Sequence, residues 1–93
     1  SGRTMLVTGG YSGLGKETAR ALAAKGAHVI LSGRDATKLS AAADELATGT
    51  GGKVDTLVCD LASLASIRGA GEEARCRFAH IDVLINNAGV MAA

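Results

Sequence analysis

The stretch Thr8-Gly9-Gly10-Tyr11-Ser12-Gly13-Leu14-Gly15 decides the fold that we expect for this chain. It follows the short apolar run Thr4–Thr8, and a series of residues at helical spacing begins within it. That series is Leu14, Thr18, Ala21, Leu22 and Lys25. Gly26 comes next, at the position where helices commonly end in a left-handed residue. The pattern predicts a strand, a tight glycine turn and a helix.

The rest of the chain repeats this alternation of apolar runs and helical patterns. Four runs rich in Val, Ile and Leu predict strands that are covered on both faces: Thr4–Thr8, His28–Ser32, Lys53–Cys59 and Val83–Asn86. A second helix is expected from the N-cap Asp35 through Leu39, Ala42, Ala43 and Leu46 to the turn Gly49-Thr50-Gly51-Gly52. A third helix, with Ser63 as its N-cap, is expected to carry one stripe of Leu64, Ile67, Gly71, Ala74 and Phe78.

Right-handed crossovers between parallel strands fix how these elements assemble. They place the strands in the order 3-2-1-4, the first two helices on one face and the third helix on the other. A crevice is then expected between the first and fourth strands, where the direction of winding reverses. We predict an α/β fold with a Rossmann-like, four-stranded parallel sheet, formed by residues 1–93 as one domain.

Composition excludes several classes of function. The chain has 93 residues, is 47% hydrophobic and carries a formal net charge of +1, so it has no general attraction for nucleic acids or acidic membranes. Tyr11 and Phe78 are its only aromatic residues, too few for a surface on which bases stack. No apolar stretch approaches the length of a membrane span.

Cysteine and histidine usage points to neither disulfides nor metal. Cys59 and Cys76 are far apart and form no C-x-x-C motif, so we expect reduced, partly buried thiols and a cytoplasmic protein. His28 and His80 are expected in turns, and neither has a carboxylate or thiolate at ligand spacing. We predict no metal site.

The glycine turn has the chemistry of a diphosphate cradle. Gly9 would allow a tight exit from the strand, Gly13 a close approach of the backbone to a pyrophosphate, and Gly15 close packing of the helix on the sheet. The amides near Leu14 and Gly15 would point the positive end of the helix dipole at the anion. We predict dinucleotide binding by this turn, Tyr11 and Ser12 included; the alternative is that the glycines only shape a turn.

The end of the second strand favours NADP(H) over NAD. Proteins that bind NAD usually have an acidic residue there for the ribose hydroxyls, and Gly33 occupies that place. Arg34 follows, and its guanidinium can grip a 2′-phosphate through two parallel hydrogen bonds. Ser12 could add a hydroxyl donor or lie in solvent. Arg34 could instead pair with Asp35 or with water.

Three motifs together resemble the cofactor-binding half of the short-chain dehydrogenases/reductases. They are Thr8-Gly-x-x-x-Gly-x-Gly15, Asp60-Leu61 and Asn86-Asn87-Ala88-Gly89, and they span nearly the whole chain. The stretch Val29-Ile-Leu-Ser-Gly-Arg-Asp35 is similar to the retinol-dehydrogenase-like and protochlorophyllide-reductase-like branches. The resemblance also implies that the fold is truncated relative to the full doubly wound sheet.

The resemblance assigns further cofactor contacts. It implies that Asp60 hydrogen-bonds the adenine amino group with Leu61 beside the ring, and that Asn87, Ala88 and Gly89 line the adenosine ribose and the approach to nicotinamide. Asp60 has an alternative role as a cap on the turn into the third helix. For Thr8 and Asn86 we favour a structural role, because polar side chains at the ends of parallel strands often tie neighbouring strands together.

The catalytic residues of that family have no counterpart in these 93 residues. The family uses a Ser followed by Tyr-x-x-x-Lys, whereas the only tyrosine here is Tyr11, with Gly15 four positions on. We therefore expect cofactor binding without specific turnover, and no catalytic residue is assigned.

Two other interpretations stay open beside the reductase fragment. One is a stand-alone, non-enzymatic nucleotide-binding or interaction module, or an engineered scaffold. The other is a methyltransferase, which Gly33-Arg34 disfavours because such enzymes usually need an acid for the ribose. The exposed edge and apolar face of the fourth strand predict self-association; the alternative is a chain that is only marginally stable alone.

Overall fold

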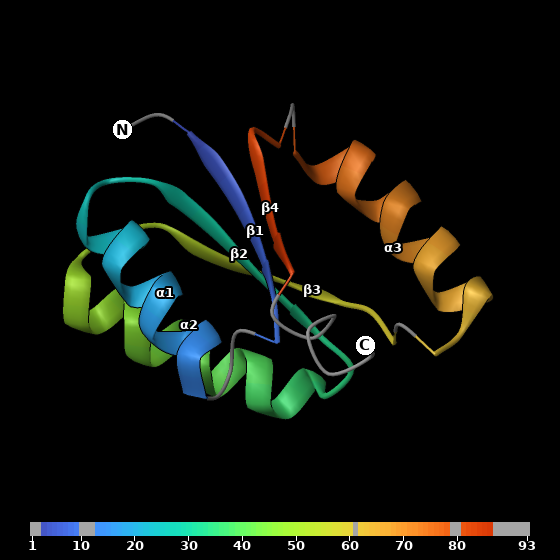
Figure 1. The fold of residues 1–93 in the computed structure, drawn as a ribbon, viewed down its shortest axis with the longest axis horizontal. Helices are drawn as coiled ribbons and strands as arrows, with labels where there is room; N and C mark the ends of the chain where they lie inside the picture. Colours follow the sequence, from blue (N-terminus) through green and yellow to red (C-terminus); the bar gives the residue numbers. More distant parts are fainter. Residues whose placement is uncertain (1–2, 10–12, 61, 79–80, 87–93) are drawn as a thin grey trace.

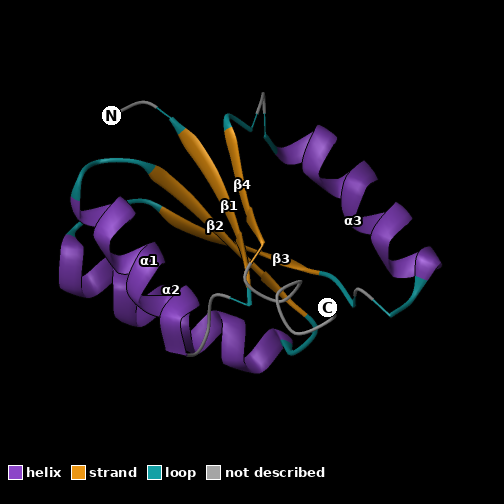
Figure 2. Ribbon diagram, in the orientation of Figure 1, coloured by secondary structure: helices purple, strands orange, loops and turns teal. Residues whose placement is uncertain are grey.

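The computed structural model describes residues 3–9, 13–60, 62–78 and 81–86 as an α/β fold (Figure 1). The elements, in chain order, are β1 (Thr4–Thr8), α1 (Gly13–Ala24), β2 (His28–Gly33), α2 (Ala36–Thr50), β3 (Val54–Val58), α3 (Leu64–Arg77) and β4 (Val83–Asn86). The four strands are parallel, in the order β3-β2-β1-β4. Helices α1 and α2 cover one face of the sheet, and α3 covers the other (Figure 2). The predicted fold class, strand order and placement of the helices are confirmed.

The larger of two apolar cores lies between the sheet and the helices α1 and α2. Its buried members are Val7, Ala19, Ala23, Ala27, Val29, Leu31, Leu39, Ala42, Ala43 and Leu46. On α2 the buried stripe is the predicted one. On α1 it is formed by Gly15, Ala19 and Ala23, whereas Leu14 is 78% exposed, so the stripe predicted from Leu14 is shifted by one residue. Small residues on this stripe let α1 lie close to the sheet.

A smaller core lies under α3. Its buried members are Ile30, Leu57, Cys59 and Ala70, with Ala74 and Phe78 packed against them. The predicted stripe is therefore only partly right, because Leu64 is 78% exposed and Ile67 is 40% exposed. The stripe that faces the sheet passes through Ala70 rather than Gly71, and the first turn of α3 has little apolar packing.

Caps define the ends of the helices. Asp35 Oδ1 accepts a hydrogen bond from Lys38 N at 3.0 Å, and Ser63 Oγ accepts one from Ser66 N at 3.2 Å, so both predicted N-caps are confirmed. Gly26 has a φ of 91°, as expected for the residue after α1. Helix α2 continues through Gly49 to Thr50 and ends at Gly51, which has a φ of 71°. The predicted four-residue turn is thus shorter than expected.

A polar cluster ties α3 to the amino-terminal end of the sheet. His28 is the first residue of β2, as the run His28–Ser32 predicts, and does not lie in a turn; its Nε2 is 2.6 Å from Asp55 Oδ2. The His28 ring meets the ring of Phe78 edge to face, and the Arg77 guanidinium lies 4.9 Å from that ring's centroid. Arg77 also donates a hydrogen bond to the carbonyl of Thr56 at 2.8 Å. These contacts hold the carboxyl-terminal end of α3 against β2 and β3.

In the described ranges we find no helix with the length and hydrophobicity that a membrane crossing requires. Both cysteines are free, as predicted, but only Cys59 is buried and Cys76 is exposed. No group of three or more His, Cys, Asp or Glu side chains suited to a metal ion occurs among the described residues.

Candidate nucleotide-binding site

Backbone hydrogen bonds align the carboxyl-terminal ends of the first three strands. Gly9 N donates to the carbonyl of Ser32 at 2.8 Å, and Cys59 N donates to the carbonyl of Gly33 at 2.7 Å. The parallel ladders thus extend one residue beyond β1 and β3. As a result, the residues that follow the strands, Gly9, Arg34 and Asp60, are brought to the same edge of the sheet, where open α/β sheets bind ligands.

Two glycines of the glycine turn, Gly9 and Gly13, are described, and both have left-handed backbone angles. Gly9 has a φ of 66° and Gly13 a φ of 55°, a region that disfavours residues with a side chain. Helix α1 begins at Gly13 and has no acidic residue in its first turn, so no carboxylate there competes for its free amides. Gly15 is buried against the sheet, as expected. Among the described residues, the first turn of α1 therefore carries no negative charge opposite its positively polarised terminus.

Arg34 directly follows the last residue of β2 and so lies at the carboxyl-terminal edge of the sheet. It is exposed, and the described residues include no carboxylate within ion-pairing distance of its guanidinium. Its neighbour Asp35 caps α2 instead, which argues against the predicted alternative of an Arg34–Asp35 pair. Gly33 places no acidic side chain at the end of β2. Among the described residues, the end of β2 therefore presents the positive charge of Arg34 with no acidic side chain paired to it.

Asp60 lies in a turn between β3 and α3 that is held by several hydrogen bonds. Its backbone N donates to Ser66 Oγ at 2.8 Å, its carbonyl accepts from Ser63 N at 3.0 Å, and its Oδ1 accepts from Ala62 N at 3.0 Å. The alternative role of Asp60 as a cap of this turn is thus observed. Among the described residues, no hydrogen-bond partner is found for its second carboxylate oxygen, Oδ2.

Several sequence-predicted site residues lie outside the described ranges. These are Tyr11, Ser12, Leu61, Asn87, Ala88 and Gly89. The predicted crevice between β1 and β4 depends on the same segments. Thr8 is described, and its hydroxyl donates to the carbonyl of Ile85 at 3.3 Å. The predicted structural role of Thr8, tying β1 to β4, is confirmed, while the side chain of Asn86 is not described.

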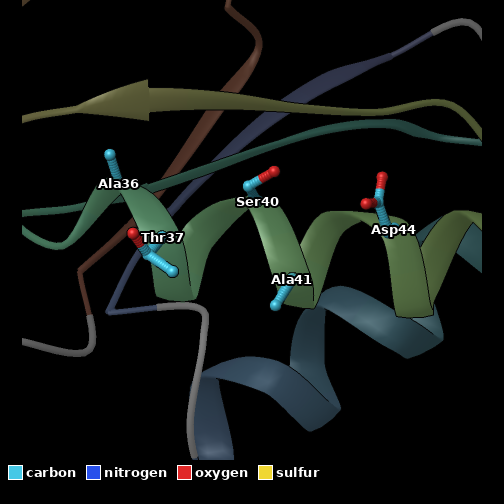
Figure 3. Close-up of a pocket in the computed structure, with 5 residues that line it drawn as sticks. All are labelled: Ala36, Thr37, Ser40, Ala41 and Asp44. Carbon is cyan, nitrogen blue, oxygen red and sulfur yellow. The ribbon is translucent and has the colours of Figure 1, made fainter.

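A depression on the surface of the described residues lies elsewhere. It is shallow and lined by Ala36, Thr37, Ser40, Ala41 and Asp44 of α2 (Figure 3). Ala36, Ser40 and Asp44 follow one another at intervals of four residues along one side of the helix, with Thr37 and Ala41 on another side (Figure 3). These side chains offer no cluster of opposed charges or nucleophiles. We assign this depression no function, since none of the predicted site residues lines it.

Comparison with known proteins gives the family. The family model of the short chain dehydrogenases matches residues 3–93. This chain belongs to the short chain dehydrogenase family. The matched range contains all three sequence motifs, so the resemblance seen in the sequence is confirmed.

Retinol dehydrogenase 13 from Homo sapiens is one of its relatives among the short chain dehydrogenases. It is 44% identical over 91 residues, an alignment that covers 97% of this chain and 28% of the relative. Dehydrogenase/reductase SDR family member 7B from Bos taurus is 43% identical over 91 residues, covering 92% of this chain and 28% of the relative. The similarity to retinol dehydrogenases is thus confirmed but is not confined to that branch.

Solved structures of short chain dehydrogenases share the fold. L-sorbose reductase from Gluconobacter frateurii, complexed with NADPH and L-sorbose, superposes with a TM-score of 0.85 at 33% identity and covers 94% of this chain and 33% of its own. Actinorhodin polyketide ketoreductase with NADPH gives a TM-score of 0.83 at 34% identity, covering 92% and 33%. The chain therefore spans about a third of each of these structures.

The sequence did not reveal the role of Ser66 near the site, nor that of Gly52 at the opposite end of the sheet. Ser66 was not singled out, because its contact with Asp60 spans six residues around a turn and has no sequence signature of its own. Gly52 was assigned only to a turn, yet it packs against α1. The one sequence signal for Ser66 is its position three residues after the N-cap Ser63, where capping side chains often occur.

Proposed function

We propose that this chain binds NADP(H) at the carboxyl-terminal edge of its sheet, as the cofactor-binding part of an oxidoreductase. In this proposal Gly9, Gly13, Leu14 and Gly15 form the cradle for the diphosphate, and Arg34 binds the 2′-phosphate. Asp60 recognises the adenine. Tyr11, Ser12, Leu61, Asn87, Ala88 and Gly89 complete the site on the strength of the family resemblance.

The observation that carries the proposal is that a helix whose first turn has no acidic residue begins at the same edge of the sheet as the exposed Arg34. The two left-handed glycines allow the backbone to approach a ligand, and the first turn of α1 lacks any acid that would repel a diphosphate. Arg34 has no acidic partner among the described residues, and Gly33 leaves room where an acid would repel a 2′-phosphate. The donor set fits a dinucleotide with an additional phosphate.

Two short chain dehydrogenases of known structure support the choice of NADPH. Both L-sorbose reductase and actinorhodin polyketide ketoreductase were crystallised with that cofactor. When bound, NADPH supplies hydride chemistry. The residues of this chain would hold the diphosphate, the 2′-phosphate and the adenine and so fix the cofactor in place.

Calorimetric titration of the 93-residue chain with NADPH and with NADH tests the proposal. We expect NADPH to bind more tightly, and removal of the 2′-phosphate to weaken binding by about tenfold or more, since hydrogen bonds to charged groups contribute about 1.5–3 kcal/mol. Equal affinities would overturn the NADP(H) assignment. No heat with either cofactor at millimolar concentration would overturn the nucleotide site itself.

The same sample tests the expected lack of turnover. The chain contains no Tyr-x-x-x-Lys motif, which in the family it resembles supplies the hydroxyl and the cation for protonating a carbonyl oxygen. NADPH absorbance should stay constant with aldehyde or ketone substrates. Steady oxidation of NADPH would show that the chain has acid–base machinery that we have not assigned.

We also propose self-association through β4 and a reducing cellular compartment. In the described part of the chain β4 ends the sheet and pairs only with β1, and open strand edges favour association. The two free thiols support a cytoplasmic setting. Sedimentation velocity over a range of concentrations should reveal a dimer or larger assembly, and a monomer throughout would contradict the first of these proposals.

A further inference from the structure

We propose that Ser66 is a positioning residue for Asp60, and that its hydroxyl is what makes the site selective for adenine over a purine without an amino group. The inference rests on the proposed function, because it assumes that the nucleotide's base lies at the end of β3. It adds a residue outside the sequence motifs and assigns it a measurable effect on base selectivity.

The hydrogen bonds around Asp60 form a closed circuit. Ser66 Oγ accepts from Asp60 N at 2.8 Å, and Ser66 N donates to Ser63 Oγ at 3.2 Å. Ser63 N in turn donates to the carbonyl of Asp60 at 3.0 Å. Both backbone polar groups of Asp60 are thus held by the first turn of α3, and the only side chain that holds its N–H is Ser66.

The first turn of α3 depends on these bonds. Leu64 is 78% exposed and Ile67 is 40% exposed, so this end of the helix has little apolar packing against the sheet. The first buried residue of α3 is Ala70. Strand pairing fixes the chain as far as Cys59, whose N donates to the carbonyl of Gly33. Beyond that point, Asp60 is joined to the start of the helix by the Ser66 hydroxyl and by the backbone bond from Ser63 N.

This circuit leaves one carboxylate oxygen for a ligand. Ala62 N engages Asp60 Oδ1 at 3.0 Å, which sets the plane of the carboxylate, while Oδ2 has no partner among the described residues. An oxygen held in this way can accept a hydrogen bond from an exocyclic amino group, whereas an oxo group at the same position of the base would repel it. Without the Ser66 hydroxyl, Asp60 N would lose its partner and the turn that carries the carboxylate would loosen, so that this discrimination would be lost.

The test compares NADPH with its deamino analogue, in which hypoxanthine replaces adenine. For the unaltered chain we expect about tenfold tighter binding of NADPH, the range of one charge-assisted hydrogen bond. Ser66→Ala should reduce the ratio to about one, mainly by weakening NADPH binding. Ser66→Thr, which keeps the hydroxyl, should retain the ratio, and Ser66→Cys, a weak acceptor of similar size, should lose it.

Ala70→Gly provides the matched control. It loosens α3 by removing a buried methyl group and adding backbone freedom, but it leaves the Ser66 hydroxyl in place. We expect a lower melting temperature with an unchanged ratio. In the absence of ligand, amide exchange at Asp60 should accelerate in Ser66→Ala while exchange at Cys59 stays slow.

The outcomes separate the inference from the proposed function. A chain that binds NADPH but shows no preference over the deamino analogue would overturn the adenine role of Asp60 and Ser66 and leave the phosphate site intact. The inference also fails if Ser66→Ala keeps the ratio, or if Ala70→Gly loses it equally. Failure to bind NADPH at all would overturn both.

Discussion

A methyl group built on Gly52 would lie 2.7 Å from the carbonyl oxygen of Ala23 and 3.2 Å from its Cβ. This contact joins the loop before β3 to the last turn of α1. A neighbour at that distance must move, and here it is helix backbone rather than the flexible end of a side chain. The absence of a side chain at Gly52 is therefore what lets α1 and the β3 entry pack together.

Gly52→Ala should destabilise the chain by about 1–3 kcal/mol, the usual cost of inserting a methyl group into a closely packed site. Urea denaturation followed by far-UV circular dichroism would measure the change. The matched control is Gly49→Ala, because Gly49 lies in α2 with nothing within 4 Å of an added methyl group. That change should be neutral or stabilise by up to about 1 kcal/mol, since alanine has the higher helix propensity. Equal effects of the two substitutions would contradict this account of Gly52.

Arg34→Ala should weaken NADPH binding by about tenfold to a hundredfold and change NADH binding little, because only NADPH carries the 2′-phosphate. Titration of both cofactors at fixed ionic strength would measure the effect. Arg68→Ala removes the same charge from an exposed position on α3 and serves as the control. If the two variants lose NADPH affinity equally, the effect is one of net charge and not of a phosphate contact.

The sheet could be predicted from the sequence because each of its strands is a short run rich in Val, Ile or Leu, and crossover handedness leaves few ways to order four such strands. The caps could be predicted too, since Asp35 and Ser63 each stand directly before a helical pattern. Periodicity did not correctly identify which faces of α1 and α3 are buried. Leu14 and Leu64 are the bulky residues that periodicity favours for the core, yet both are exposed, and small residues such as Ala19 and Ala70 are buried in their place.

For the candidate site, the sequence revealed the glycine turn and Arg34, because both depend on local backbone chemistry. Contacts between side chains that only folding brings together could not be predicted from the sequence. The His28–Asp55 pair joins residues 27 positions apart through the pairing of β2 with β3, and the Asp60–Ser66 bond depends on how α3 leaves its turn. Side-chain partners across a sheet or around a turn follow from register and helix direction, which residue spacing alone does not specify.

His28→Ala should destabilise the chain by about 1–2 kcal/mol through the loss of a partly buried hydrogen bond to a carboxylate and of the contact with Phe78. The loss should concentrate at the carboxyl-terminal end of α3. Hydrogen exchange should then accelerate at Ala74 and Phe78, while the amides of α2 stay protected. Asp55→Asn is the companion variant, as it keeps a possible hydrogen bond to His28 while removing the charge, and it should have the smaller effect. Uniform acceleration throughout the chain would show that the cluster does not act locally on α3.

Glu45 links α2 to two cations of α1, and this link should make stability depend on pH. Its carboxylate accepts from Lys16 Nζ at 2.7 Å and lies 3.3 Å from Arg20 Nη2. The hydrogen bond from Lys16 and the charge of that lysine, followed by Arg20, lower the pKa of Glu45 below its ordinary value of 4.5. A carboxyl group with a lower pKa in the folded state favours folding at any pH above its ordinary value, and the benefit disappears as the pH falls through the folded-state pKa.

Glu45→Gln should therefore be less stable than the unaltered chain at pH 7, and the difference should shrink as the pH falls below 4.5. Melting temperatures measured from neutral to acidic pH would show the two curves converging. Asp44→Asn is the control, because it removes one negative charge from the adjacent exposed residue, for which no ion pair is found among the described residues. Added salt should also narrow the difference at neutral pH, since the Glu45 pairs are exposed and screened. A difference that stays constant across this pH range would mean that Glu45 stabilises the α1–α2 contact by packing rather than by charge.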